Sequence, residues 1–151
     1  MNESKLKPML LIHTAFFFAI ITFALVAYLQ VKDVIHFSPG TNRNDALYPL
    51  FPILSIVFIF LGFFMFNRQI AAIDSAMSSD DKIMRYQTAF LIRCAFIEAG
   101  ALLNIVAFLL TGNSVFLIFV GCALIAFVMI RPAKQKIIDT LNLQFPETEK
   151  L

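Results

Sequence analysis

Four long runs of apolar residues set the strongest constraint on how this chain can fold. They cover residues 8–29, 47–66, 88–110 and 115–130. A helix needs about 20 apolar residues to cross a hydrocarbon core of about 30 Å, and only the last run is short enough to need its flanks. Because a backbone in lipid must satisfy its hydrogen bonds within its own segment, each run is predicted to be a helix. We therefore expect an all-α integral membrane protein whose four transmembrane helices lie in the lipid bilayer as two antiparallel hairpins.

The composition excludes the common soluble classes of protein. Of the 151 residues 60% are hydrophobic and 15% are charged, whereas soluble chains are roughly 45–50% apolar and about 25% charged. The net charge of +2 is dispersed, so we expect no nucleic-acid partner. The sequence contains no Gly-rich phosphate loop, no nucleophile elbow and no His pair at metal or haem spacing. We accordingly expect no enzyme, no cofactor and no metal site.

The distribution of Lys and Arg predicts the orientation of the chain. Nine of these residues fall on one side of the predicted spans: Lys5, Lys7, Arg68, Lys82, Arg85, Arg131, Lys134, Lys136 and Lys150. Only Lys32 and Arg43 fall on the other side. Because cytoplasmic loops carry the excess of basic residues, both termini are predicted to be cytoplasmic. We expect the chain in the bacterial inner (cytoplasmic) membrane.

The connections between the spans differ in length and character. Residues 31–46 form a long outer loop that contains Pro39-Gly40, whereas residues 111–114 are so few that the third and fourth helices must form a tight hairpin. The cytoplasmic connection, residues 68–87, is predicted to be extended helix, because apolar residues recur there at helical spacing. These residues are Ile70, Ile73 and Met77. Ser78 and Asp81 form a capping-box pattern that would begin the third helix in the cytoplasm.

The four spans and their connections make up residues 1–131, and a cytoplasmic tail follows, residues 132–151. Its apolar residues recur at helical spacing between lysines: Ala133, Ile137, Ile138 and Leu141. This pattern predicts a short amphipathic helix. The helix either lies in the membrane interface or packs on the cytoplasmic connection.

Glu98 is the main functional candidate, because no other acidic residue falls inside a predicted span. It follows Thr88 by ten residues, which places it roughly 15 Å deep, near the midplane. An ionised carboxylate loses its hydration there, so the group must hold a proton or bind a cation such as sodium. On a helical projection it is surrounded by apolar or small residues: Leu91, Cys94, Ala95, Ala101, Leu102 and Ile105. The small ones allow another helix to approach.

Arg93 and Asn104 share another face of the third helix. Arg93 lies roughly 8 Å deep, from where its side chain is expected to extend to the cytoplasmic interface. Asn104 follows it by eleven residues on the same face, with Gly100 between them. This polar line could contact a partner helix.

The first two helices offer further polar groups. His13 is expected to form a hydrogen bond across helices, although it could also titrate near neutral pH. Pro52 is expected to break a backbone hydrogen bond near the outer end of the second helix, beside Ser55. Around Glu98, the candidate supporting groups are Arg93, Asn104, His13, Ser55 and Cys94. Cys94 and Cys122 both lie in apolar runs and are expected to serve packing.

The segment Ala95-Phe96-Ile97-Glu98-Ala99 resembles the ion-binding segment of rotary ATPase proteolipids (subunit c). In that family a helical hairpin bends through a polar cytoplasmic loop, and its second helix carries a midmembrane Glu or Asp. Residues 47–110 have this layout, and the family's Arg-Gln-Pro loop signature stands here as Arg68-Gln69-Ile70. The resemblance implies that Glu98 is the carboxylate that binds a proton or sodium ion.

Two functional hypotheses follow, and a third has weaker support. In the first, the chain is a subunit of a membrane complex, or self-associates, and Glu98 binds or relays a proton or sodium ion. In the second, it is a structural or accessory subunit in which protonated Glu98 forms a hydrogen bond between helices. A membrane enzyme or transporter would need another polar group to converge on Glu98, and His13, Ser55 and Asn104 are the candidates.

Overall fold

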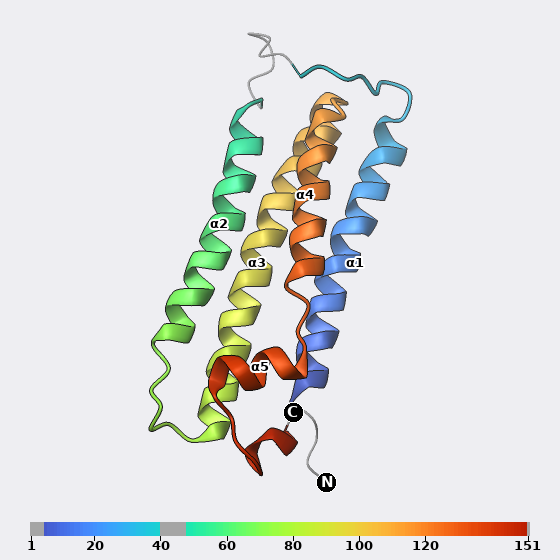
Figure 1. Cartoon of the computed structure of the whole chain (residues 1–151). Coiled ribbons are helices and arrows are strands. Elements are labelled where there is room, and N and C mark those ends of the chain that lie inside the picture. Colours follow the sequence, from blue (N-terminus) through green and yellow to red (C-terminus); the bar gives the residue numbers. More distant parts are fainter. Residues whose placement is uncertain (1–4, 40–47, 151) are drawn as a thin grey trace.

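The computed structural model describes residues 5–39 and 48–150, and within these ranges the chain is all-helical (Figure 1). Its α-helices are α1 (Leu6–Val31), α2 (Leu50–Ala71), α3 (Ser79–Thr111), α4 (Val115–Met129) and α5 (Lys134–Leu141), followed by the 3-10 helix η1 (Glu147–Lys150). The expected all-α class is confirmed. Two residues used in the predictions lie outside the described residues: Leu47, the first residue of the second predicted span, and Arg43, one of the basic residues counted for the orientation.

Three of the helices, α1, α2 and α3, are long and apolar enough to cross a membrane. With 15 residues, α4 is about 22 Å long at 1.5 Å per residue, short of a hydrocarbon core of about 30 Å. It meets the length requirement only together with α5, from which it is bent by 73°. The described chain therefore has three candidate spans, or up to four.

The central element of the bundle is α3, which packs against α1, α2 and α4. In Figure 1 the helices run alternately up and down, with α2 on one side of α3 and α1 on the other. The expected pairing of the first two spans as a hairpin is therefore wrong. Residues 32–39 cross the end of the bundle instead of turning back along α1, because their backbone is hydrogen-bonded to the α3–α4 turn.

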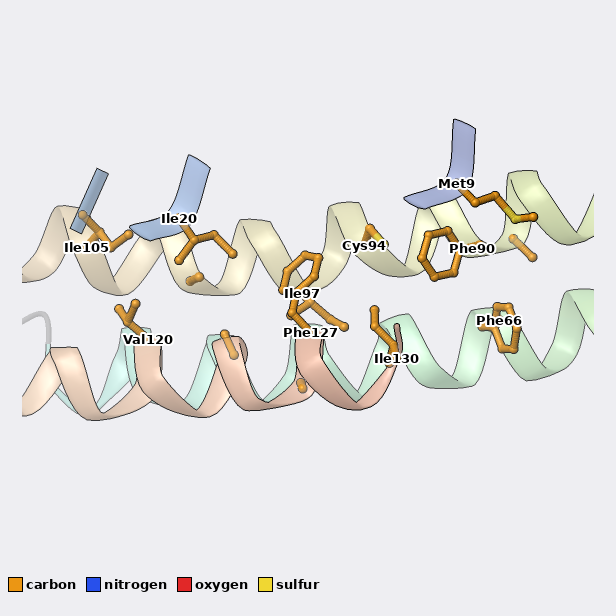
Figure 2. Close-up of a cluster of buried hydrophobic side chains, with 14 of the residues drawn as sticks. Met9, Ile20, Phe66, Phe90, Cys94, Ile97, Ile105, Val120, Phe127 and Ile130 are labelled. Atoms are coloured by element: carbon orange, nitrogen blue, oxygen red, sulfur yellow. The ribbon is translucent and has the colours of Figure 1, made fainter. Parts of the chain in front are cut away.

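The hydrophobic core follows one face of α3 (Figure 2). Phe90, Cys94, Ile97 and Ile105 recur on that face at helical spacing and are at most 1% exposed. Figure 2 shows Val120 and Phe127 of α4, and Ile130 at its end, packed along this face, and Met9 and Ile20 of α1 join the same cluster. The single continuous core explains why α3, the helix that carries Glu98, is held on several sides.

The turn between α3 and α4 is tight, as the short connection predicted. Gly112 ends α3 with a φ of 70°, a left-handed conformation that favours glycine. A Cβ atom on this residue would lie 2.8 Å from the main-chain oxygen of Val34. The His36 amide donates to the Gly112 oxygen at 3.0 Å, and the Ser114 amide donates to the His36 oxygen at 2.9 Å. Residues 34–36 thus close over the turn.

The buried side chain of Asn113 strengthens this closure. Its Oδ1 accepts from the amide of Ser38 at 3.2 Å and from the amide of Val115 at 3.1 Å, and its Nδ2 donates to the Ser38 oxygen at 2.9 Å. One fully buried asparagine therefore connects the segment after α1 to the start of α4.

The connection between α2 and α3 differs in part from the extended helix that was expected over residues 68–87. Helix α2 ends at Ala71, and residues 72–78 form turns. Asp74 Oδ1 accepts a hydrogen bond from the Ala76 amide at 2.9 Å, a local side-chain bond that competes with helix. The predicted helix start is confirmed, because Ser78 Oγ accepts from the Asp81 amide at 3.2 Å and also donates to Asp81 Oδ2 at 2.7 Å.

The tail helix α5 lies across the end of the bundle (Figure 1). Its apolar side consists of the buried residues Ile137 and Leu141. A cavity of about 120 Å³ separates the end of α5 from the α2–α3 connection and is lined by residues of both: Ile70, Ile73, Asp74, Ser75, Lys82, Thr140, Leu141 and Asn142. Helix α5 also contacts α3, which agrees with one of the two expected placements, packing on the α2–α3 connection.

Candidate functional site

Glu98 lies near the middle of α3, on the boundary between its buried and exposed faces. Cys94 and Ala101, about one turn to either side, are fully buried, whereas Leu91 and Ala95 are exposed. Within residues 5–39 and 48–150, no hydrogen bond or ion pair reaches the Glu98 carboxylate. One copy of the described chain therefore supplies this group with neither a cation nor a hydrogen-bond donor.

Of the expected supporting groups, Cys94 lies about one turn from Glu98 on the same helix, whereas the others do not converge on it. Ser55 of α2 contacts Gly100, which is two residues beyond Glu98 and so about 200° around the helix. Asn104 is turned about 120° away from Glu98 and is fully buried. His13 contacts α4 instead. The polar interior of the bundle and the Glu98 carboxylate thus occupy different sides of α3.

Small residues bring α2 and α3 into close contact at two levels. A Cβ atom at Gly62 would lie 3.2 Å from the main-chain oxygen of Arg93. A Cβ atom at Gly100 would lie 3.1 Å from Ser55 Oγ and 3.2 Å from the Ser55 backbone. Small residues at helix interfaces permit this approach of backbones. The predicted contact of the Arg93–Asn104 face with a partner helix is observed, and the partner is α2.

Arg93 is buried, contrary to the expected extension to the interface. It is 8% exposed, and its guanidinium carbon lies 3.7 Å from the centre of the Phe66 ring. The rings of Phe90 and Phe63 follow at 5.4 and 5.6 Å. The side chain does extend toward the α2–α3 connection, but α2 covers it there with aromatic rings. Cation–π contacts of a desolvated guanidinium contribute about 2 kcal/mol or more.

Three buried polar atoms at the α2–α3 interface have no hydrogen-bond partner among the described residues: Ser55 Oγ, Arg93 Nε and Asn104 Oδ1. Asn104 is partly satisfied, because its Nδ2 donates to the Gly100 oxygen at 3.0 Å and to the Phe51 oxygen at 3.4 Å. Together these groups form a line of polar atoms along an otherwise apolar interface.

His13 joins α1 to the end of α4. Its Nε2 lies 2.8 Å from the main-chain oxygen of Phe127, and its ring packs against Phe127 and Phe90. Because a carbonyl oxygen only accepts, Nε2 must carry the hydrogen. The expected hydrogen bond across helices is confirmed.

Pro52 does not interrupt α2. The helix begins at Leu50, so Pro52 falls in its first turn, where backbone amides have no partner within the helix in any case. The expected break of a backbone bond is therefore wrong. The structure places the start of this helix later than the apolar run does.

Two surface hollows could not be predicted from the sequence, because the residues that line each of them come from different helices. One, of about 280 Å³, lies between α1 and the end of α4 and includes His13, Thr14 and Arg131. The other, of about 330 Å³, lies between α2 and α3 and is lined by Gln69, Ala72, Met84, Arg85 and Thr88. The sequence feature that could have indicated the first hollow is Arg131, an arginine at the end of an apolar run.

The described residues contain no group of three or more His, Cys, Asp or Glu side chains that could hold a metal ion. The Glu98 carboxylate has no hydrogen-bond or ion-pair partner among these residues. Comparison of the chain with protein-family models, with curated proteins and with solved structures gave no match.

Proposed function

We propose that this protein is an integral subunit of a membrane assembly in which Glu98 binds or relays a proton or sodium ion at a contact with another subunit or another copy of the chain. The observation that carries the proposal is the position of Glu98. It is partly buried halfway along α3 and has no hydrogen-bond or ion-pair partner within the described ranges. The resemblance of this segment to the proteolipids of rotary ATPases points to the same role.

The physical argument begins with the cost of an ionised group in lipid. A carboxylate at that depth requires a proton, a cation or a donor from elsewhere. Arg93, the cation nearest in sequence, is occupied by aromatic rings at the α2–α3 interface. The exposed residues Leu91 and Ala95 beside Glu98 leave its edge of α3 open to a second helix. A partner at this edge would complete the site.

The proposal includes four crossings with both termini in the cytoplasm. The short helix α4 runs beside α3 and, with its flanking residues, would form the fourth crossing. The basic residues at the end of the bundle that contains α5 support this orientation by the positive-inside rule.

Reaction with dicyclohexylcarbodiimide tests the role of Glu98, because this apolar reagent modifies protonated carboxyl groups in apolar surroundings. We expect the label on Glu98 in the full-length protein, mapped by peptide mass spectrometry, and not on Glu147 of η1. Protection by sodium at constant pH would identify a sodium site, whereas protection by high pH alone would identify a proton site. Absence of label on Glu98 would contradict the proposal.

The alternative is an accessory subunit in which protonated Glu98 donates a hydrogen bond to another chain. The missing partner of Glu98 among the described residues supports this function as well. Glu98→Gln keeps a donor, whereas Glu98→Ala removes it. If Glu98→Gln leaves every ion-linked activity of the assembly intact while Glu98→Ala weakens assembly, the accessory role is correct and ion binding is excluded.

A further inference from the structure

The hollow between α1 and the end of α4 is a second candidate site, separate from Glu98. It has a volume of about 280 Å³. Its lining combines three polar side chains with four apolar ones: His13, Thr14 and Arg131, and Leu10, Phe17, Phe18 and Val128. A ligand that fits this lining must itself be part polar and part apolar.

Arg131 supplies the positive charge of the hollow. It is exposed and lies two residues beyond the end of α4, where Pro132 prevents the helix from continuing. No ion pair of Arg131 is found within residues 5–39 and 48–150. His13 is engaged elsewhere, because its Nε2 donates to the Phe127 oxygen. A guanidinium binds phosphate oxygens through two parallel hydrogen bonds, so Arg131 is suited to a phosphate group.

The guanidinium and the two phenylalanines of the hollow lie at different depths along the bundle axis. Arg131 lies at the end of the bundle where α1 begins and α4 ends, whereas Phe17 and Phe18 lie about 11 Å farther along α1 than Leu10. Phe18 is 58% and Val128 63% exposed. These side chains continue the hollow into the exposed apolar face of the bundle. A free phosphate ion would leave this apolar wall uncovered, whereas a phospholipid would cover both parts.

We propose that this hollow binds an anionic phospholipid, with its phosphate on Arg131 and one acyl chain along Phe17, Phe18 and Val128. Basic pockets between helices at the membrane rim are suited to anionic headgroups. The inference rests on membrane integration of the chain and not on any role of Glu98.

The chain contains no tryptophan, so Phe18→Trp introduces a single fluorescent reporter into the hollow. The full-length protein is placed in phosphatidylcholine nanodiscs that contain a minor fraction of lipid with brominated acyl chains, which quench tryptophan on contact. We expect brominated phosphatidylglycerol to quench this reporter more strongly than brominated phosphatidylcholine. Phe60→Trp, on the exposed side of α2, is the reference and should show no such preference.

Arg131→Gln in the Phe18→Trp background should reduce the preference for phosphatidylglycerol about fivefold, the effect of one basic residue at an anionic surface. Arg68→Gln is the matched control, because Arg68 is exposed at the same end of the bundle and outside the hollow. It should leave the preference unchanged. The preference of the protein with Arg131 intact should also weaken at high salt, a measurement that does not depend on how the variant folds.

Several results would overturn the inference. Equal quenching by the two brominated lipids at Phe18→Trp would mean that the hollow does not select anionic lipid. An equal effect of Arg68→Gln would assign the preference to the overall charge of the surface. Loss of phosphatidylglycerol quenching on addition of millimolar inorganic phosphate would identify a phosphate-ion site instead. Quenching by brominated phosphatidylcholine in both reporters would still report membrane integration, so these outcomes are separate from those at Glu98.

Discussion

The Nε2 atom of His13 in α1 lies 2.8 Å from the main-chain oxygen of Phe127 in α4, residues that are 114 positions apart in the sequence. The last carbonyl groups of a helix have no amide partner within that helix. His13 therefore caps the end of α4 from a neighbouring helix. It joins α1 to α4 in the same region where the hollow for an anionic lipid begins.

Replacement of His13 by alanine is expected to destabilise the protein. The Phe127 oxygen would lose its donor in a buried position, which costs about 1–3 kcal/mol, and the ring contacts with Phe90 and Phe127 would be lost. The measurement is the thermal unfolding midpoint in detergent. His36→Ala is the control, since His36 is exposed and its Nδ1 lies 3.3 Å from the Val34 oxygen. Equal midpoints of the two variants would show that the capping bond contributes nothing.

Gly100→Ala is expected to lower stability, because the new Cβ atom would lie 3.1–3.2 Å from three atoms of Ser55, two of them in the backbone. Overpacking of this kind costs about 1–3 kcal/mol, more than the gain in helix propensity of up to about 1 kcal/mol. Gly121→Ala in α4 is the matched control, since nothing lies within 4 Å of its Cβ position. This control should be neutral or stabilising in the same detergent melt. A Gly100→Ala protein as stable as Gly121→Ala would mean that α2 and α3 separate easily.

The contact of Arg93 with Phe66 should appear as an energetic coupling. We expect Phe66→Leu to destabilise the protein more when Arg93 is present than in an Arg93→Met background, by about 2 kcal/mol for a desolvated cation–π pair. Unfolding free energies of the four proteins in the double-mutant cycle measure this difference. Phe64→Leu, at an exposed ring of the same helix, should show no coupling to Arg93. A coupling energy near zero between Arg93 and Phe66 would mean that Phe66 contributes only through apolar packing.

The proposed orientation predicts which introduced cysteines are accessible from outside intact cells. In a background with Cys94→Ala and Cys122→Ser, Phe37→Cys in the outer loop should react with a membrane-impermeant maleimide. Ser75→Cys in the α2–α3 connection should react only after the membrane is opened. Both residues are exposed in the structure, so a difference in labelling would reflect the side of the membrane and not burial. The reverse pattern would place both termini outside.

The long helices were predictable from the sequence because a run of apolar residues has few other folds available to it. Ser78 marked the start of α3 for an equally local reason, since an N-cap acts within one turn. The burial of Arg93 was not predictable in this way. Its position along the helix favoured extension of the side chain to the interface. Its burial depends instead on α2, which places Phe66 over the guanidinium.

The arrangement of the helices could not be predicted from local sequence patterns either. The first two spans were expected to pair, yet α1 and α2 lie on opposite sides of α3. The deciding contacts join distant residues, such as His36 with Ser114 and Ser38 with Asn113. For the same reason, the sequence predicted that His13 bonds to another helix but did not identify Phe127 as its partner. The isolation of Glu98 from other polar groups depends on these long-range contacts and became visible only in the folded chain.

The closure formed by His36, Ser38 and Asn113 has a mechanical consequence for the bundle. These hydrogen bonds fasten the segment after α1 to the turn before α4, so the two helices cannot separate at that end without breaking them. At the opposite end, one side-chain bond from His13 performs the same task. Relative movement of α1 and α4 would therefore pivot about the Asn113 end and open widest beside Arg131.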